Sequence, residues 1–248
     1  MTDRLSVPTL VACSHGTADP EGAAAVTRLV EAVRRRAGVP VEEAHVDVHG
    51  PYLADVAFAQ PAAVVVPLLL AAGYHAHVDI AGVVASHPEA AQADALGPDR
   101  RVTSLLADRL HAAGVRRGDT VVLAAAGSSD DGADASVRRT AADLARVIGA
   151  PVTVGYGAAR APRLADEVAR VRRLHPGRRV VLVSYLLATG HFHRRVLAAG
   201  ADLVTDPLLS GPHVDFRLVD LVVERYRAAR LNRLRSGTRQ EVTTVHGR

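Results

Sequence analysis

Three polar side chains, His15, Asp47 and His75, stand at the ends of three apolar runs in the first half of the sequence. Each run has the length and the Val, Leu and Ala content of a buried strand. Ligands of parallel sheets bind beyond the carboxyl ends of the strands, so we expect these side chains to converge on one place. Imidazoles and a carboxylate are a suitable ligand set for a borderline divalent metal such as Fe, Co, Ni or Zn. The spacing therefore predicts a metal-handling site in the first half of the chain.

The other histidines leave several interpretations open. A single histidine at a strand end is more often a hydrogen-bonded surface residue than a metal ligand. His45 and His49 fall on one face of the second expected strand, which is typical of a solvated strand edge. His191 and His193 follow a glycine in the second half, and they are candidates for a wall that faces the site.

Sequence motifs for nucleotide or serine chemistry are absent. The sequence contains no lysine, so it has no P-loop, and no G-x-G-x-x-G follows the first expected strand. A loop of the second half carries Asp130 and Asp131, whose charges would repel phosphate. No G-x-S-x-G nucleophile motif is present either. These absences disfavour nucleotide binding and serine hydrolysis.

Short apolar runs alternate with helical patterns along the whole chain. Near-continuous Val and Leu strands separated by helices are typical of parallel sheets that are covered on both faces. We expect strands at residues 9–13, 41–48, 63–70, 90–95, 120–125, 152–156, 180–187 and 201–205. We expect helices around residues 26–37 and at 101–113, 136–148, 164–174 and 214–229.

The second half of the chain repeats the first. Residues 16–19 (Gly-Thr-Ala-Asp) match 127–130 (Gly-Ser-Ser-Asp), and residues 69–73 (Leu-Leu-Ala-Ala-Gly) match 186–190 (Leu-Leu-Ala-Thr-Gly). The expected fold is therefore α/β, with two duplicated flavodoxin-like lobes and a cleft between them. The expected divisions are 1–116, 117–231 and a polar, disordered tail at 232–248. Ala126 stands where the first half has His15, so one site built by the first half is the simpler interpretation.

Composition narrows the class of protein further. The chain has 248 residues and 30 basic residues, all of them arginine, whose planar guanidinium suits a bidentate grip on carboxylates. Aromatic residues make up 3% and tryptophan is absent, which argues against base stacking on nucleic acid. Cys13 is the only cysteine, so no disulfide forms within the chain. The longest apolar run, residues 62–72, is too short to cross a bilayer. We expect a cytoplasmic monomer or homodimer that binds neither nucleic acid nor membrane.

Two segments resemble a known family. Leu-Val-Ala-Cys-Ser-His-Gly-Thr at residues 10–17 and Val-Pro-Leu-Leu-Leu-Ala-Ala-Gly-Tyr-His at 66–75 are similar to motifs of the class II tetrapyrrole chelatases, specifically the long, two-lobed sirohydrochlorin chelatases. The resemblance implies metal insertion into a macrocycle without ATP, with His15 and His75 as catalytic residues and metal ligands. A family glutamate falls on Asp47, which is one methylene shorter. Whether His75 or His77 enters the cleft stays open.

The resemblance also implies the substrates. We expect Fe²⁺ insertion into sirohydrochlorin to give siroheme, with the metal as a substrate and no resident cofactor. The alternatives are Co²⁺ insertion for cobalamin synthesis, a non-catalytic metal or tetrapyrrole carrier, and a small-molecule transferase. Arginines suit the carboxylate rim of such a macrocycle, and Arg100, Arg101 and Arg195 are further candidates for it. The expected substrate-binding residues are Ser14, Gly73, Tyr74 and Arg194.

Overall fold

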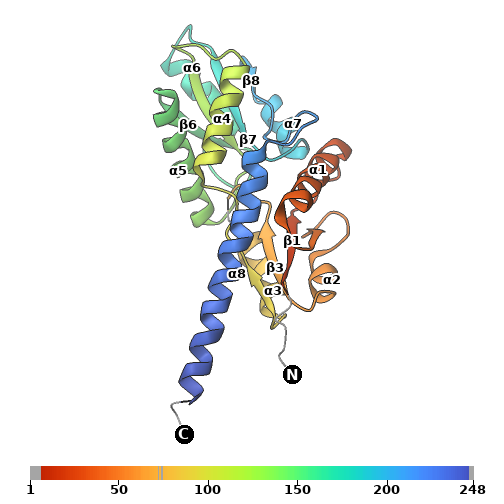
Figure 1. Ribbon diagram of the computed structural model, residues 1–248. Helices are drawn as coiled ribbons and strands as arrows, with labels where there is room; N and C mark the ends of the chain where they lie inside the picture. Colours follow the sequence, from red (N-terminus) through yellow and green to blue (C-terminus); the bar gives the residue numbers. More distant parts are fainter. Residues whose placement is uncertain (1–6, 72, 74, 246–248) are drawn as a thin grey trace.

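Two parallel sheets of four strands each frame the described part of the molecule (Figure 1). The computed structural model describes residues 7–71, 73 and 75–245, without the side chains of residues 75–77 and 236–245. The first sheet has the order β2-β1-β3-β4, with β1 (Thr9–Ser14), β2 (Val41–His45), β3 (Ala63–Pro67) and β4 (Ala90–Gln92). The second has the order β6-β5-β7-β8, with β5 (Thr120–Ala125), β6 (Val152–Tyr156), β7 (Val180–Tyr185) and β8 (Leu203–Val204). The two-lobed α/β prediction is confirmed.

Helices connect the strands and cover the sheets. They are α1 (Pro20–Ala37), α2 (Leu53–Phe58), the π-helical turn η1 (His75–Ile80), α3 (Ala81–Ala85), α4 (Arg100–Ala112), α5 (Asp131–Ile148), α6 (Leu164–Leu174), α7 (His191–Leu197) and α8 (Phe216–Val245). Helix α5 begins five residues before the predicted start at 136, because Asp130 caps it by accepting a hydrogen bond from the Ala133 amide at 2.9 Å. None of the helices in the described residues is long and apolar enough to cross a membrane.

The duplication extends to the backbone of the loops. The amide of Asp47 donates to the carbonyl of His15 at 3.0 Å, and the amide of Ala158 donates to the carbonyl of Ala126 at 2.8 Å. Each of these loops then passes through a non-glycine residue with a positive φ, Val48 at 71° and Ala159 at 58°. The two halves therefore place equivalent residues at equivalent positions around the cleft.

The last helix of each half packs on the opposite sheet. Helix α4 contacts α5 and β7 of the second lobe, whereas α8 contacts α1, β3 and β4 of the first (Figure 1). The predicted boundary at residue 116 therefore separates the two sheets, but each lobe also packs the last helix of the other half. The chain crosses to the second lobe after β4 and returns to the first lobe after β8. A single apolar cluster, with Leu10 and Val66 from one sheet and Val121 and Val183 from the other, joins the lobes.

Helix α8 is longer than predicted. The sequence predicts an end at residue 229 and a disordered tail from Asn232, but the helix continues to Val245. Arg233 forms an ion pair with Glu89, which ties this part of the helix to the first lobe. Residues 246–248 of the predicted tail lie outside the described residues.

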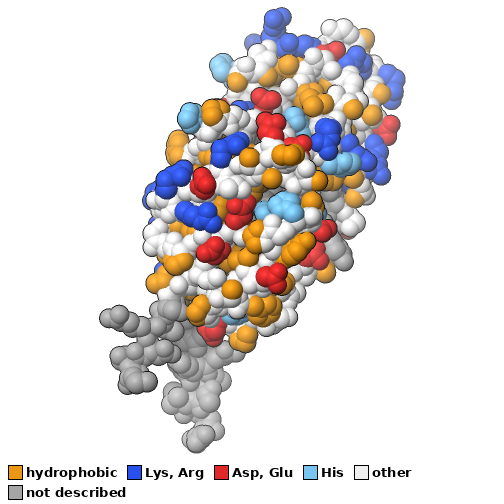
Figure 2. Space-filling view, turned by 90° about the vertical axis from the view of Figure 1, so that its right-hand side faces the viewer, with side chains coloured by type: hydrophobic (Ala, Val, Ile, Leu, Met, Phe, Trp, Pro, Cys, Tyr) orange, Lys and Arg blue, Asp and Glu red, His pale blue; other side chains and the backbone are white. Residues whose placement is uncertain are grey.

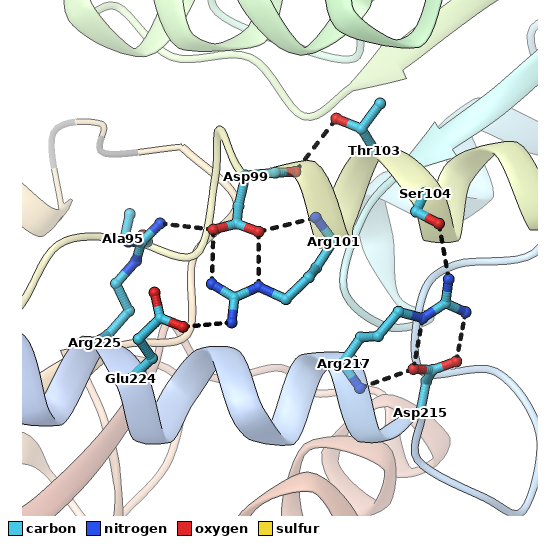
Figure 3. Close-up of polar contacts among 9 residues, drawn as sticks. All are labelled: Ala95, Asp99, Arg101, Thr103, Ser104, Asp215, Arg217, Glu224 and Arg225. Carbon is cyan, nitrogen blue, oxygen red and sulfur yellow. Dashed lines mark hydrogen bonds and ion pairs between the residues drawn. The ribbon is translucent and has the colours of Figure 1, made fainter. Parts of the chain in front are cut away.

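A polar network fixes α4 against α8 where the chain crosses between lobes (Figure 3). Arg101 donates to both carboxylate oxygens of Asp99 at 2.9 Å, and to Glu224 of α8 at 2.7 Å. Arg225 of α8 donates to the carbonyl of Ala95 at 2.9 Å. Two turns earlier in α8, Arg217 pairs with Asp215 and donates to Ser104 of α4 at 2.9 Å. The crossing is thus held by several charge-assisted hydrogen bonds.

Candidate functional site

A cavity of about 780 Å³ lies between the carboxyl ends of the two sheets. Its first-lobe wall comprises residues 14–19, 68–71 and 73, which follow β1 and β3. Its second-lobe wall comprises residues 125–129 and 185–194, which follow β5 and β7. The loops after β2 and β6 add Val48 and residues 158–160. Ligand sites of parallel sheets are expected at this end of the strands.

His15 lines this cavity at the end of β1. The next residue, Gly16, has a φ of 93°, and a Cβ atom there would lie 2.2 Å from the carbonyl oxygen of Asp47. Only glycine fits this close approach between the two loops. The loop after β1 is therefore locked against the loop after β2, and this contact fixes the backbone that presents His15.

Asp47 is not brought into the cavity with His15. Its side chain is exposed and accepts a hydrogen bond from the amide of Val48 at 2.7 Å, and Val48 rather than Asp47 lines the cavity. The predicted strand runs to residue 48, but β2 ends at His45. The alternation of side chains that would have aimed Asp47 at the site therefore stops before it.

The second expected histidine lies outside the described side chains. Gly73 lines the cavity, and η1 begins two residues later with the backbone of His75. The side chains of His75 and His77, and the whole of Tyr74, lie outside the described residues. A Cβ atom on Gly73 would lie 2.8 Å from Oγ of Ser128, so the two lobes approach each other closely at this loop.

A buried imidazole stands behind the first-lobe wall. Nδ1 of His45 lies 2.8 Å from Oγ of Ser14, a cavity-lining residue that also accepts from the Gly16 amide at 3.2 Å. His45 is only 4% exposed, so the prediction of a solvated strand edge is wrong for this residue. Burial lowers the pKa of His45, and it raises the pKa of Glu43, whose Oε1 lies 3.7 Å from Nε2 of His45. The imidazole is thus a neutral partner that fixes the Ser14 hydroxyl.

Arg160 occupies the second-lobe wall and was not among the predicted residues. It donates to the carbonyl oxygens of Ser128 and Ser129 at 3.1 and 3.2 Å, and it pairs with Asp131 at 2.6 Å. The repeat places Arg160 at the position equivalent to His49, so aligning the two halves would have found it. The second lobe therefore presents a fixed guanidinium at a loop whose first-lobe equivalent carries a histidine.

Arg194 lies on the cavity wall as part of a contact between the lobes. Its NH1 donates to Oδ2 of Asp19 at 2.9 Å, and the Thr189 hydroxyl donates to Oδ1 of Asp19 at 3.1 Å. Nearby His193 has a buried Nε2 with no hydrogen-bond partner. Burial lowers the pKa of His193, although the charges of Asp206 and other acidic groups oppose this.

The remaining arginine candidates lie away from the cavity lining. Arg101 is committed to Asp99 and Glu224, and Arg100 precedes it at the start of α4. Arg195 donates to the carbonyl of Gly157 at 2.7 Å. Among the described residues, no group of three or more His, Cys, Asp and Glu side chains is arranged to hold a metal ion.

Basic and acidic side chains are mixed on the face shown in Figure 2, and basic side chains do not form one continuous stripe there.

Duplicated parallel-sheet lobes around a cavity with a strand-end histidine define the two-lobed fold of the class II chelatases. The CbiX family model matches residues 9–113 and 120–227, and the chain belongs to this family. No match was found among curated proteins.

Solved structures of similar fold include three chelatases. SirB from Bacillus subtilis with Fe³⁺ has a TM-score of 0.73 and 22% identity, covering 90% of this chain and 95% of that one. The sirohydrochlorin chelatase SirB from Bacillus subtilis subspecies spizizenii in complex with cobalt has a TM-score of 0.69 and 20% identity, covering 90% and 94%. CbiX, the terminal enzyme for biosynthesis of siroheme in denitrifying bacteria, has a TM-score of 0.63 and 21% identity, covering 90% and 99%.

Proposed function

We propose that this protein inserts Fe²⁺ into sirohydrochlorin without ATP and so produces siroheme. The observation that carries the proposal is the position of His15, at a strand end on the wall of the cavity between the lobes of a CbiX-family chain. The iron-bound SirB and the siroheme-forming CbiX are proteins of similar fold, and they support this choice of metal and product.

The reaction needs only functions that imidazoles can supply. The metal must lose part of its water shell and meet the ring face, and two pyrrole N–H protons must leave. A neutral imidazole is a weak, exchangeable ligand and also a base. In this proposal His15 and His75 share these roles, and Asp47, exposed beside Val48, is not a direct ligand. Few protein ligands are wanted, because a closed four-ligand site would retain the metal.

The macrocycle carboxylates require cationic partners on the cavity wall. Arg160, which follows β6, and Arg194, in α7, both line the cavity. Ser14, held by His45, and Gly73 line the first-lobe side and would lie next to the ring. Arginine can bind a carboxylate through two parallel hydrogen bonds, which fixes orientation as well as charge. Binding of a polycarboxylate ring in this cavity is therefore part of the proposal.

Co²⁺ insertion is the second candidate, and the cobalt complex of SirB favours it. The ligand types suit both ions, so the same assay must compare them. We also propose a cytoplasmic location, because a single buried cysteine, Cys13, fits a reducing compartment. A monomeric or homodimeric state stays a prediction, as does the absence of a resident cofactor.

The test is a metal-insertion assay under anaerobic conditions, with sirohydrochlorin and either Fe²⁺ or Co²⁺ and no ATP, followed by absorbance. We expect catalytic turnover, and His15→Ala or His75→Ala should reduce the rate by at least about tenfold, the low end for loss of a general base. His175→Ala is the matched control, because His175 is exposed at the end of α6. Metal or tetrapyrrole binding in a one-to-one ratio without turnover would instead identify a carrier. Unchanged rates in both site variants would remove these histidines from the mechanism.

A further inference from the structure

The cavity is bridged at one edge by a contact between the lobes, which we call the rim contact: Asp19, Gly22, Thr189 and Arg194. Asp19 is the N-cap of α1 in the first lobe, and its Oδ1 accepts from the Gly22 amide at 2.9 Å. The same carboxylate accepts from Thr189 and from Arg194 of the second lobe, as described above. One carboxylate thus caps a helix and joins the two lobes.

The rim contact is tight. A Cβ atom on Gly22 would lie 2.4 Å from the carbonyl oxygen of Thr189, and one on Gly190 would lie 3.0 Å from Oγ1 of Thr17. The equivalent helix of the second lobe begins differently. Asp130 caps α5 through the amide of Ala133, so a methyl group occupies the position that is glycine in α1. The lobes also approach closely at the equivalent place, between Gly73 and Ser128, and the Asp19 side adds a carboxylate that bonds to Thr189 and Arg194 of the other lobe.

Arg194 retains accessible donors within this contact. Its side chain is 65% exposed, and only NH1 is bonded to Asp19. The arginine side of the ion pair is solvent-exposed, and ion pairs that reach solvent contribute little free energy. Asp19 would keep its hydrogen bonds from Gly22 and Thr189 if Arg194 turned to another carboxylate. Exchange of one carboxylate for another at Arg194 would therefore leave the α1 cap intact.

Resting on the proposed function, we propose that Asp19 is a specificity-determining residue that occupies Arg194 as an internal substitute for a carboxylate of the tetrapyrrole. A polycarboxylate ring that enters the cavity displaces Asp19 from Arg194 and gains a charge-assisted hydrogen bond. A macrocycle without a carboxylate at this place must open the Asp19–Arg194 pair across the rim without replacing it. Asp19 therefore lowers affinity for every ring, and the carboxylated ring regains it through Arg194.

The test is a double-mutant cycle on the dissociation constant of sirohydrochlorin, measured by its fluorescence without metal, and on KM in the insertion assay. Asp19→Asn keeps an oxygen acceptor for Gly22 and Thr189 but removes the charge. We expect it to tighten binding by about twofold to fivefold, the range that corresponds to an exposed ion pair. Arg194→Gln should weaken binding by about tenfold or more, as expected for a lost charge-assisted hydrogen bond. In the Arg194→Gln background, Asp19→Asn should have no further effect.

Asp202→Asn is the matched control, because Asp202 also pairs with an arginine, Arg172 at 3.0 Å, and accepts from a backbone amide, that of Val180 at 2.7 Å, outside the cavity lining. It should change neither binding nor KM. Unchanged or weaker binding by Asp19→Asn would overturn the inference, and so would additive effects in the double variant. If the wild type binds the ring but does not insert metal, the proposed function fails while the binding cycle still decides the role of Asp19. If the wild type does not bind the ring, both proposals fall.

Discussion

Gly22 offers a direct test of how closely the two lobes meet. It lies in the first turn of α1, and an added Cβ atom would lie 2.4 Å from the carbonyl oxygen of Thr189. Close carbon–oxygen contacts in proteins are about 3.3–3.6 Å long. Gly22→Ala must therefore move the helix and the facing loop apart by roughly 1 Å, since the obstacle is backbone and cannot rotate away.

The expected cost follows from two opposing contributions. Overpacking of this kind costs about 1–3 kcal/mol. Alanine in place of glycine in a helix returns up to about 1 kcal/mol. We expect Gly22→Ala to lower the free energy of unfolding by about 1–2 kcal/mol, with an unchanged dependence on urea concentration, measured by equilibrium denaturation.

Gly82→Ala is the matched control for this substitution. Gly82 is exposed in α3, and no heavy atom lies within 4 Å of the Cβ position there. The same change should therefore raise stability by up to about 1 kcal/mol, through helix propensity alone. If Gly22→Ala proved as stable as Gly82→Ala, the rim contact between the lobes would not exist in solution.

Three further predictions concern polar groups beneath the cavity and at the lobe crossing. His45→Ala should cost about 2–4 kcal/mol in urea unfolding, because it leaves a cavity and a buried Ser14 hydroxyl without its partner; a loss below the error of the fit would contradict the burial of His45. Burial holds the folded pKa of His45 below its ordinary 6.5, so the unfolded chain binds this proton more readily. Its contribution to stability is complete above pH 6.5 and is lost as the pH falls below that value, and His45→Gln should flatten this part of the stability–pH curve. Arg101→Gln should cost about 1–3 kcal/mol, because it removes the bidentate partner of the Asp99 carboxylate, whereas Arg100→Gln on the neighbouring residue should change stability by less than about 0.5 kcal/mol; equal effects would refute the network in Figure 3.

The fold class was predictable because the strands are recognisable in the sequence as short apolar runs. Runs such as residues 62–72 are apolar at every position, which is typical of strands in a sheet covered on both faces. The exchange of α4 and α8 was not predictable, because helical periodicity shows that a helix has an apolar face but not which sheet covers it. The extension of α8 had a weak signal in Leu231 and Leu234, which continue helical spacing within an otherwise polar segment.

Residues of the candidate site were predictable where a strand end fixed them. His15 follows the last residue of β1, so the carboxyl-end rule applied to it directly. The rule gave a wrong position for Asp47, because β2 stops at His45 and the chain then turns through Val48 with a φ of 71°. A β-branched residue rarely adopts this conformation, so no sequence signal marks the turn. Burial of His45 was equally hidden, because it depends on Ser14 and Glu43 being close in space.

The divergence of the two halves fits the chemistry of metal insertion better than two equal half-sites would. Under the proposed function, one macrocycle would enter the cavity and accept one metal, so a second copy of the histidine at position 15 would hold an ion with no ring nitrogen to receive it. In the second lobe, Ala126 stands at the position equivalent to His15. Arg160 stands at the position equivalent to His49 and carries a fixed positive charge. Under the proposed function, the strand-end loops of the first lobe would handle the metal through His15, and those of the second lobe would bind a carboxylate through Arg160. On this argument, Ala126→His should leave ring binding unchanged and slow turnover by retaining metal, whereas Arg160→Gln should weaken ring binding by about tenfold, the expected loss for a charge-assisted hydrogen bond. Metal retention measured after dialysis would separate the two effects, and faster turnover by Ala126→His would refute the division of roles between the lobes.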